Sequence, residues 1–175
     1  MPRRRLAVAL LLPDDVSMHV DGLRRALGDD RTRVAPHITL VPPVNVREEA
    51  VVDARDAMKA AAATVEPFDL VVGPAATFHP VTPVVYLAVG GDVGAVHGLR
   101  DALLVEPMAR PAEHPFVPHV TIADALAADR IDAALVALAD FEALCPMRSI
   151  TLLEDRAPGP HRWNPIAEAR LGRRP

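Results

Sequence analysis

Cysteine is almost absent from this sequence, since Cys145 is the only one among 175 residues. A single thiol cannot form a disulfide within the chain, and it excludes a zinc site built from several cysteines. This cysteine content is typical of a reducing compartment, so we expect a cytoplasmic protein. We expect Cys145 itself to be buried as a small apolar residue.

Long apolar runs are also lacking, and no stretch approaches the ~20 apolar residues that a transmembrane helix needs. Three arginines at 3–5 followed by the apolar run Leu6–Leu12 resemble the start of a signal peptide. The run is short, however, Pro13 and two aspartates follow it at once, and no small-residue cleavage site is present. We therefore expect a buried first strand and no contact with a membrane.

Aromatic residues are scarce, at 3% of the sequence, and the 19 basic residues are outnumbered by 23 acidic ones, which gives a net charge of −4. An acidic balance argues against a protein that binds nucleic acid through bulk electrostatics, although a local basic cleft is compatible with it. Half of the residues are hydrophobic, which indicates a folded protein. The length suits a single domain over 1–175 with a substantial core.

A five-residue pattern occurs twice, as Pro36-His37-Ile38-Thr39-Leu40 and as Pro118-His119-Val120-Thr121-Ile122. In an extended strand, successive side chains point to opposite faces, so the histidine and threonine of each copy share one face. The aliphatic residues then take the other face, as a strand on a core requires. We expect two similar halves, each of which contributes one His-Thr pair to a shared cleft.

The surrounding pattern of apolar runs, helical periodicity and turn residues predicts an α+β protein with antiparallel sheets and helices outside. Asp14 or Asp15 is expected to cap the first helix, Pro42-Pro43 to stop the first motif strand, and Asp124 to head the last helix. Strands are expected at 6–12, 33–41, 67–73 with a continuation to 78, 84–89, 117–123, 147–155 and 162–171, and helices at 14–27, 46–64, 93–105 and 127–140.

The doubled motif carries chemistry that suits a phosphodiester. Imidazole exchanges a proton readily near neutral pH, so one histidine can act as a base and the other as an acid. A threonine hydroxyl can donate a hydrogen bond to an anionic oxygen. One histidine would activate a water or hydroxyl and the other would protonate the leaving oxygen, while the threonines hold the non-bridging oxygens. A lone strand histidine is more often structural, but the duplication favours the catalytic interpretation, and we expect neither a metal nor a cofactor.

The two motifs are similar to the paired His-hydrophobic-Thr-hydrophobic signature of the two-histidine phosphoesterase superfamily, the 2′-5′ RNA ligase-like and cyclic phosphodiesterase proteins. The segments 115–118, 86–89 and 149–152 also resemble family sequences, and the order of elements covers essentially the whole chain. The resemblance implies a bilobal, pseudo-twofold fold in which two antiparallel sheets line a central groove. It implies a metal-independent enzyme that hydrolyses or transesterifies 2′,3′-cyclic or 2′-5′ phosphodiester bonds. Val41-Pro42-Pro43 stands where the RNA ligase-like branch often has Phe-Leu-Gly, so the resemblance does not extend to the substrate of that branch.

By the same resemblance, His37 is the expected proton donor to the departing ribose oxygen and His119 the expected activator of water, although pseudo-symmetry leaves the reverse assignment open. Thr39 and Thr121 are the expected phosphate-binding residues. We predict Phe116 as the residue that stacks on a base. Weaker candidates for stacking, phosphate contact or the groove rim are Phe78, Tyr86, Trp163, Arg110, Arg156, His114 and His161.

Several alternatives stay open at this point. The substrate is an RNA terminus or a small nucleotide, or else a small cyclic phosphate of another metabolite. A non-catalytic RNA-binding module is disfavoured, because a binder has no need for paired proton-transfer groups. A metal site at the two histidines is disfavoured by the lack of a carboxylate or third histidine at ligand spacing. Nothing in the sequence demands a protein partner or more than a monomer.

Overall fold

The protein, described by a computed structural model over residues 2–29, 34–111, 114–155 and 162–172, contains two four-stranded antiparallel sheets. The first has the order β2-β1-β7-β8 and the second the order β5-β4-β3-β6. The expected α+β class with antiparallel sheets is confirmed. The strands are β1 Arg3–Leu11, β2 His37–Arg47, β3 Phe68–Thr77, β4 Val85–Gly91, β5 His119–Ala123, β6 Ala143–Met147, β7 Ser149–Asp155 and β8 Trp163–Arg170.

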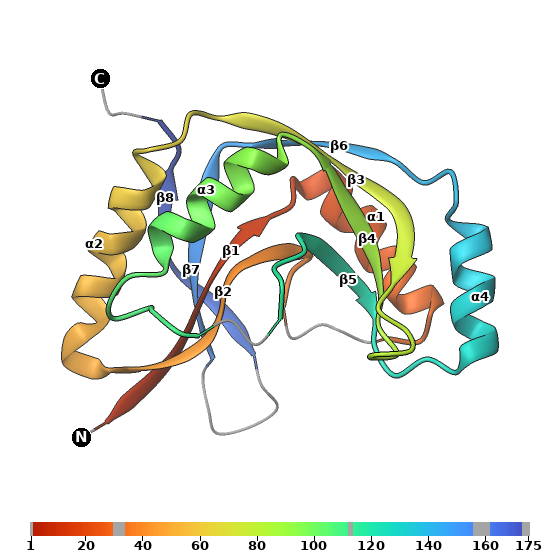
Figure 1. The fold of residues 1–175 in the computed structure, drawn as a ribbon, viewed down its shortest axis with the longest axis horizontal. Coiled ribbons are helices and arrows are strands. Elements are labelled where there is room, and N and C mark those ends of the chain that lie inside the picture. Colours follow the sequence, from red (N-terminus) through yellow and green to blue (C-terminus); the bar gives the residue numbers. More distant parts are fainter. Residues whose placement is uncertain (1, 30–33, 112–113, 156–161, 173–175) are drawn as a thin grey trace.

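The helices cover the outer faces of the two sheets (Figure 1). The first sheet is covered by α2 (Val51–Ala62), preceded by the 3-10 turn Glu48–Ala50, and by α3 (Val93–Leu103), whereas α1 (Asp14–Ala26) and α4 (Ala128–Ala137) pack on the second. The helix α1 follows a strand of the first sheet but packs on the second, and α3 makes the opposite crossing. No helix in the described ranges has both the length and the apolar character needed to cross a bilayer.

The two expected halves correspond to the two sheets, but they are not two consecutive stretches of the chain. The strands β7 and β8 return to the first sheet, where β7 pairs with β1, and the second sheet takes all of its strands from the middle of the chain. This return depends on β1, which needs a partner strand on each side. Its run from Leu6 to Leu10 is buried on both faces, and it pairs with β2 on one side and β7 on the other. Such a run predicts a central strand, but it does not identify the strands that flank it.

Pro42-Pro43 does not stop the motif strand, which continues to Arg47. The register of β1 against β2 shifts between Leu6 and Val8, so both prolines lie in a bulged stretch. The strand is also the edge of its sheet. A proline lacks only an N–H donor, and bulges and edge strands tolerate that loss.

Other boundaries differ from expectation in smaller ways. The strand β6 was not predicted, because it is short, lies at a sheet edge and contains Pro146, a residue that argues against a strand. Neither Asp14 nor Asp15 makes a side-chain cap, although both lie in the first turn of α1. Asp124 does not head α4, whose N-cap is Ala127. The continuation of β3 past Gly73-Pro74 is confirmed.

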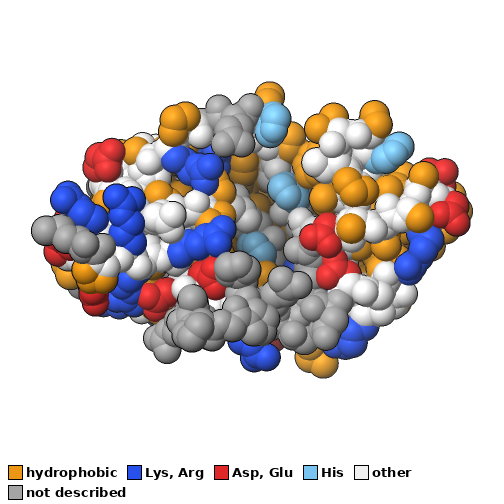
Figure 2. All heavy atoms as spheres, turned by 90° about the horizontal axis from the view of Figure 1, so that it is seen from below, with side chains coloured by type: hydrophobic (Ala, Val, Ile, Leu, Met, Phe, Trp, Pro, Cys, Tyr) orange, Lys and Arg blue, Asp and Glu red, His pale blue; other side chains and the backbone are white. Residues whose placement is uncertain are grey.

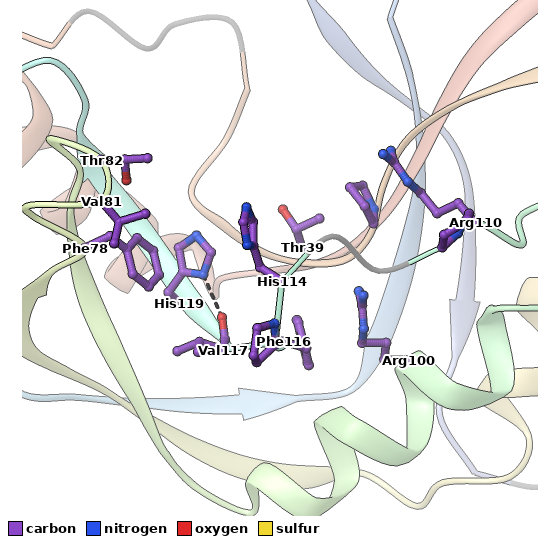
Figure 3. Close-up of a pocket in the computed structure, with 13 residues that line it drawn as sticks. Thr39, Phe78, Val81, Thr82, Arg100, Arg110, His114, Phe116, Val117 and His119 are labelled. Carbon is purple, nitrogen blue, oxygen red and sulfur yellow. Dashed lines mark hydrogen bonds between the residues drawn. The ribbon is translucent and has the colours of Figure 1, made fainter.

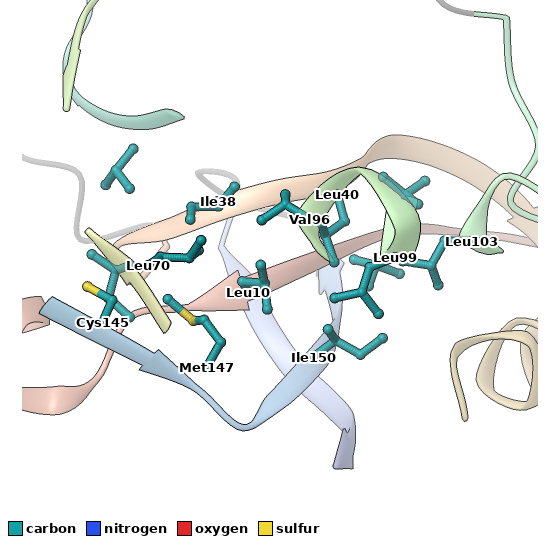
Figure 4. Packing of buried hydrophobic residues seen from close by; sticks show 14 of the residues in the cluster. Leu10, Ile38, Leu40, Leu70, Val96, Leu99, Leu103, Cys145, Met147 and Ile150 are labelled. Atoms are coloured by element: carbon teal, nitrogen blue, oxygen red, sulfur yellow. The ribbon is translucent and has the colours of Figure 1, made fainter. Parts of the chain in front are cut away.

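A single apolar cluster joins the two sheets beneath the motif strands. Figure 4 shows Ile38 and Leu40 of β2 in this core. The corresponding residues of β5, Val120 and Ile122, are equally inaccessible to solvent. The predicted alternation is confirmed, since the motif histidines and threonines are partly exposed on the other face. Cys145 is buried as expected, and burial raises the pKa of its thiol to about 11.

Candidate active site

The two motif strands lie beside each other, each at the edge of its own sheet (Figure 1). The strands β2 and β5 are in contact, although they belong to different sheets. On its inner edge β2 pairs with β1, so that Thr39 lies opposite Ala9. On its inner edge β5 pairs with β4, so that Thr121 lies opposite Tyr86. The fold therefore brings the two distant copies of the motif together along one seam.

Both motif histidines are oriented by the same kind of hydrogen bond, from the ring to a backbone carbonyl. The Nδ1 atom of His37 lies 2.7 Å from the carbonyl oxygen of Ala35, and that of His119 lies 2.7 Å from the carbonyl oxygen of Val117. A carbonyl only accepts, so Nδ1 carries the hydrogen and Nε2 is the nitrogen that can take up or release a proton. The proline that precedes each histidine favours an extended residue before it, which explains why both copies form the same bond.

A cavity of about 580 Å³ opens beside β5 and is lined by two of the four motif residues, Thr39 and His119. Figure 3 shows Thr39 between His119 on one side and two arginines on the other. A volume of this size is in the range of small-molecule sites. The other lining residues are Pro42, Phe78, Val81, Thr82, Arg100, Arg110, Pro111, His114, Pro115, Phe116 and Val117.

A second cavity, of about 190 Å³, holds His37 together with Thr39, Pro43 and Trp163. Thr39 lines both cavities, so the two adjoin at this residue. Figure 2 shows histidine side chains gathered along a hollow in the middle of this face. Of the four motif residues, Thr121 is not among the described residues that line either cavity; it lies on β5 on the same face as His119.

One end of the larger cavity is an aromatic wall against His119. The ring of Phe78 stacks on Tyr86 with centroids 4.3 Å apart, and it meets the His119 ring edge-on at 5.1 Å. Tyr86 also contacts the His119 ring, at 5.4 Å. Edge-to-face contacts of this kind restrict ring rotation, so the wall helps to keep the imidazole in place.

The other end of the larger cavity is basic. The guanidinium of Arg100 lies 4.3 Å from the ring centroid of Phe116 and donates to the Leu40 carbonyl at 2.6 Å. Burial lowers the pKa of Arg100; Asp101 opposes this effect and Arg110 adds to it. Arg110 donates to the Pro43 carbonyl at 2.8 Å. An acidic chain thus presents local positive charge beside the motif residues, as a phosphate-binding groove would require.

The weaker sequence candidates separate clearly in the structure. His114, Arg110 and Phe78 line the larger cavity, together with Phe116, the predicted stacking residue. His79 is exposed in a loop. Arg156 and His161 lie outside the described residues. No cluster of three or more metal-ligating side chains occurs within the described ranges.

Arg100 was missed by the sequence analysis, although a signal for it exists. It lies on the buried face of α3, which is otherwise formed by Val96, Leu99 and Leu103. A charged residue at a position of a helix where the periodicity calls for an apolar one requires a buried partner. Here the partners are the Leu40 carbonyl and the ring of Phe116.

Comparison with known proteins identifies relatives over most of the chain. A protein of Staphylococcus haemolyticus named as a candidate phosphoesterase is 26% identical over 127 residues, which is 73% of this chain and 75% of that protein. A candidate phosphoesterase of Halalkalibacterium halodurans is 30% identical over 100 residues, 57% of this chain and 58% of that protein.

Two solved structures have the same fold. The structure of E. coli LigT complexed with 3′-AMP has a TM-score of 0.66 at 19% identity and covers 97% of this chain and 99% of that chain. TT0787 of Thermus thermophilus has a TM-score of 0.68 at 19% identity, with 97% and 98% covered. The model of the 2′-5′ RNA ligase superfamily matches residues 12–159. The chain therefore belongs to this superfamily of two-histidine phosphoesterases, as its paired motifs indicated.

Proposed function

We propose that the protein hydrolyses 2′,3′-cyclic phosphodiesters, at RNA ends or in small nucleotides, by general acid–base catalysis with two histidines. The observation that carries this proposal is the repeated geometry: two His-Thr pairs on adjacent edge strands, with each ring held by the carbonyl two residues earlier. A phosphodiester needs one proton removed and one delivered. Two imidazoles oriented alike at a single seam meet that need.

In the proposed reaction, Nε2 of one histidine removes a proton from water, and the water oxygen forms a bond to phosphorus. The bond from phosphorus to one ribose oxygen breaks, and Nε2 of the other histidine gives that oxygen a proton. Thr39 and Thr121 donate hydrogen bonds to the non-bridging oxygens, whose negative charge grows in the transition state. We assign His119 as the base and His37 as the acid. An RNA 5′-hydroxyl in place of water gives a 2′-5′ linkage, so ligation is a second activity of the same groups.

The rest of a nucleotide fits along the larger cavity. With the cyclic phosphate at Thr39, the base and ribose extend toward the aromatic wall or toward Phe116, which stays our predicted stacking residue. Phe116 already has Arg100 over its ring and His97 against it at 5.2 Å. The complex of the LigT neighbour with 3′-AMP supports a nucleotide of this size as the ligand.

A small cyclic phosphate of another metabolite is the alternative substrate, and a panel of substrates distinguishes it. We expect purified protein to open 2′,3′-cyclic nucleotides and RNA with a cyclic end at the same rate with and without EDTA. Product formation is measured by chromatography, with a 2′-5′-linked dinucleotide as a third substrate. A requirement for added metal would contradict the mechanism. Turnover of only a non-nucleotide cyclic phosphate would replace the substrate class, and binding of RNA without turnover would indicate a binding module.

A further inference from the structure

A buried arginine joins the two motif strands from the side of α1. The side chain of Arg24 is 2% exposed. Its Nε and Nη2 atoms lie 3.3 and 3.2 Å from the Thr121 carbonyl, and its Nη1 donates to the Val34 carbonyl at 2.9 Å. Thr121 belongs to β5, whereas Val34 lies in the segment that enters β2. A single guanidinium therefore links the second motif strand to the segment that enters the first.

Arg100 makes the reciprocal connection from the side of α3. It donates to the carbonyl of Leu40, a residue of β2, and lies over Phe116, in the segment that enters β5 (Figure 3). Each arginine thus bonds the backbone of one motif strand and contacts the approach to the other. The crossing of α1 and α3 between the sheets places the two arginines in this arrangement.

The position of the motif strands explains why arginine suits this role. Edge strands present carbonyls that no neighbouring strand can pair, and buried carbonyls need a donor. A guanidinium has five N–H donors in a rigid plane and keeps its charge, so it can satisfy two carbonyls at a fixed separation. Asp21, 3.2 Å from Nη1 of Arg24, balances the buried charge, as a buried cation requires.

We propose that Arg24 and Arg100 are positioning residues that fix the separation of the His37 and His119 rings by joining β2 to β5. This inference rests on the proposed function, since the separation matters for the rate only if both rings act on one phosphate. A misplacement of about 1 Å in a catalytic group lowers a rate about a hundredfold. Arg24 is the cleaner test of the two, because it is not among the described residues that line either cavity, whereas Arg100 lines the larger one.

The experiment compares Arg24→Lys and Arg24→Met with Arg130→Met. Arg130 donates to the Leu27 carbonyl at 2.8 Å from α4, a bond of the same kind that involves neither motif strand. We expect kcat on a 2′,3′-cyclic nucleotide to fall about tenfold for Arg24→Lys and about a hundredfold for Arg24→Met. KM should stay within about threefold and Arg130→Met should retain wild-type kcat. If Arg24→Met does not fold, Arg24→Lys decides the test.

A double-mutant cycle separates positioning from general destabilisation. In an His37→Ala background there is no second ring to place, so Arg24→Lys should cost less than about threefold there. A full additive loss in that background, or an unchanged kcat in the single variant, overturns the proposal.

Imidazole NMR signals supply a readout that does not depend on activity. Arg24→Lys should shift the signals of both rings, and unchanged signals of both rings overturn the inference. This readout also applies if the wild type hydrolyses none of the substrates. Such inactivity refutes the proposed function and is distinct from failure of the positioning role.

Discussion

Replacement of His37 or His119 by alanine is expected to lower kcat for hydrolysis of a 2′,3′-cyclic nucleotide by about a hundredfold to ten thousandfold. This is the usual range for loss of a general acid or base. Each ring is oriented by a hydrogen bond from its Nδ1 to the backbone carbonyl of the residue two positions earlier. The two variants should therefore lose activity to a similar extent. Initial rates at saturating substrate measure the effect.

The matched control for the histidine variants is His19→Ala, because His19 is an exposed residue of α1. It should retain wild-type kcat. The double variant His37→Ala/His119→Ala should be little slower than the worse single variant, since groups that act as a unit are strongly non-additive. Full activity in either single variant would remove that histidine from the mechanism.

The second large effect is expected at the motif threonines. Thr39→Val keeps the shape of the side chain and removes its hydroxyl, so we expect kcat to fall about a hundredfold, the scale for loss of one donor to a developing anion. Thr39 lines both cavities whereas Thr121 lines neither; this comparison covers only the residues that the structure describes. The loss at Thr121→Val should therefore be smaller, about tenfold.

Serine substitution provides the control for the threonines. Thr39→Ser retains the hydroxyl and should recover most of the lost activity, whereas Thr64→Val, at an exposed position after α2, should have no effect. Equal rates for Thr39→Val and wild type would mean that this hydroxyl does not contact the phosphate. A larger loss at Thr121 than at Thr39 would place the phosphate nearer to β5 than proposed.

The parts of the fold that depend on local pattern were predictable from the sequence. The alternation of His37 and Thr39 with Ile38 and Leu40 identified the buried face of β2 correctly, because side-chain period is a property of the strand itself. The repeat of the motif indicated a shared site. Both inferences need only short stretches of sequence.

Strand pairing was not predictable in the same way. The return of β7 and β8 to the first sheet depends on contacts between segments far apart in the chain, and apolar runs do not identify their partners. The continuation of β2 through Pro42 and Pro43 could not be predicted for the same reason, since only the sheet order shows that β2 is an edge strand. The acceptors of Arg24 and Arg100 could not be predicted either, because they are backbone carbonyls, which carry no signature in the sequence.

The most direct test of the two-histidine mechanism is the pH dependence of kcat/KM for a 2′,3′-cyclic nucleotide in EDTA, measured for the wild type and both histidine variants. A base that must be deprotonated gives the acidic limb of the profile, and an acid that must be protonated gives the alkaline limb. The wild type should show a bell, His119→Ala should lose the acidic limb, and His37→Ala should lose the alkaline limb. A bell that persists in both variants would contradict the assignment of the histidines as the proton-transfer pair.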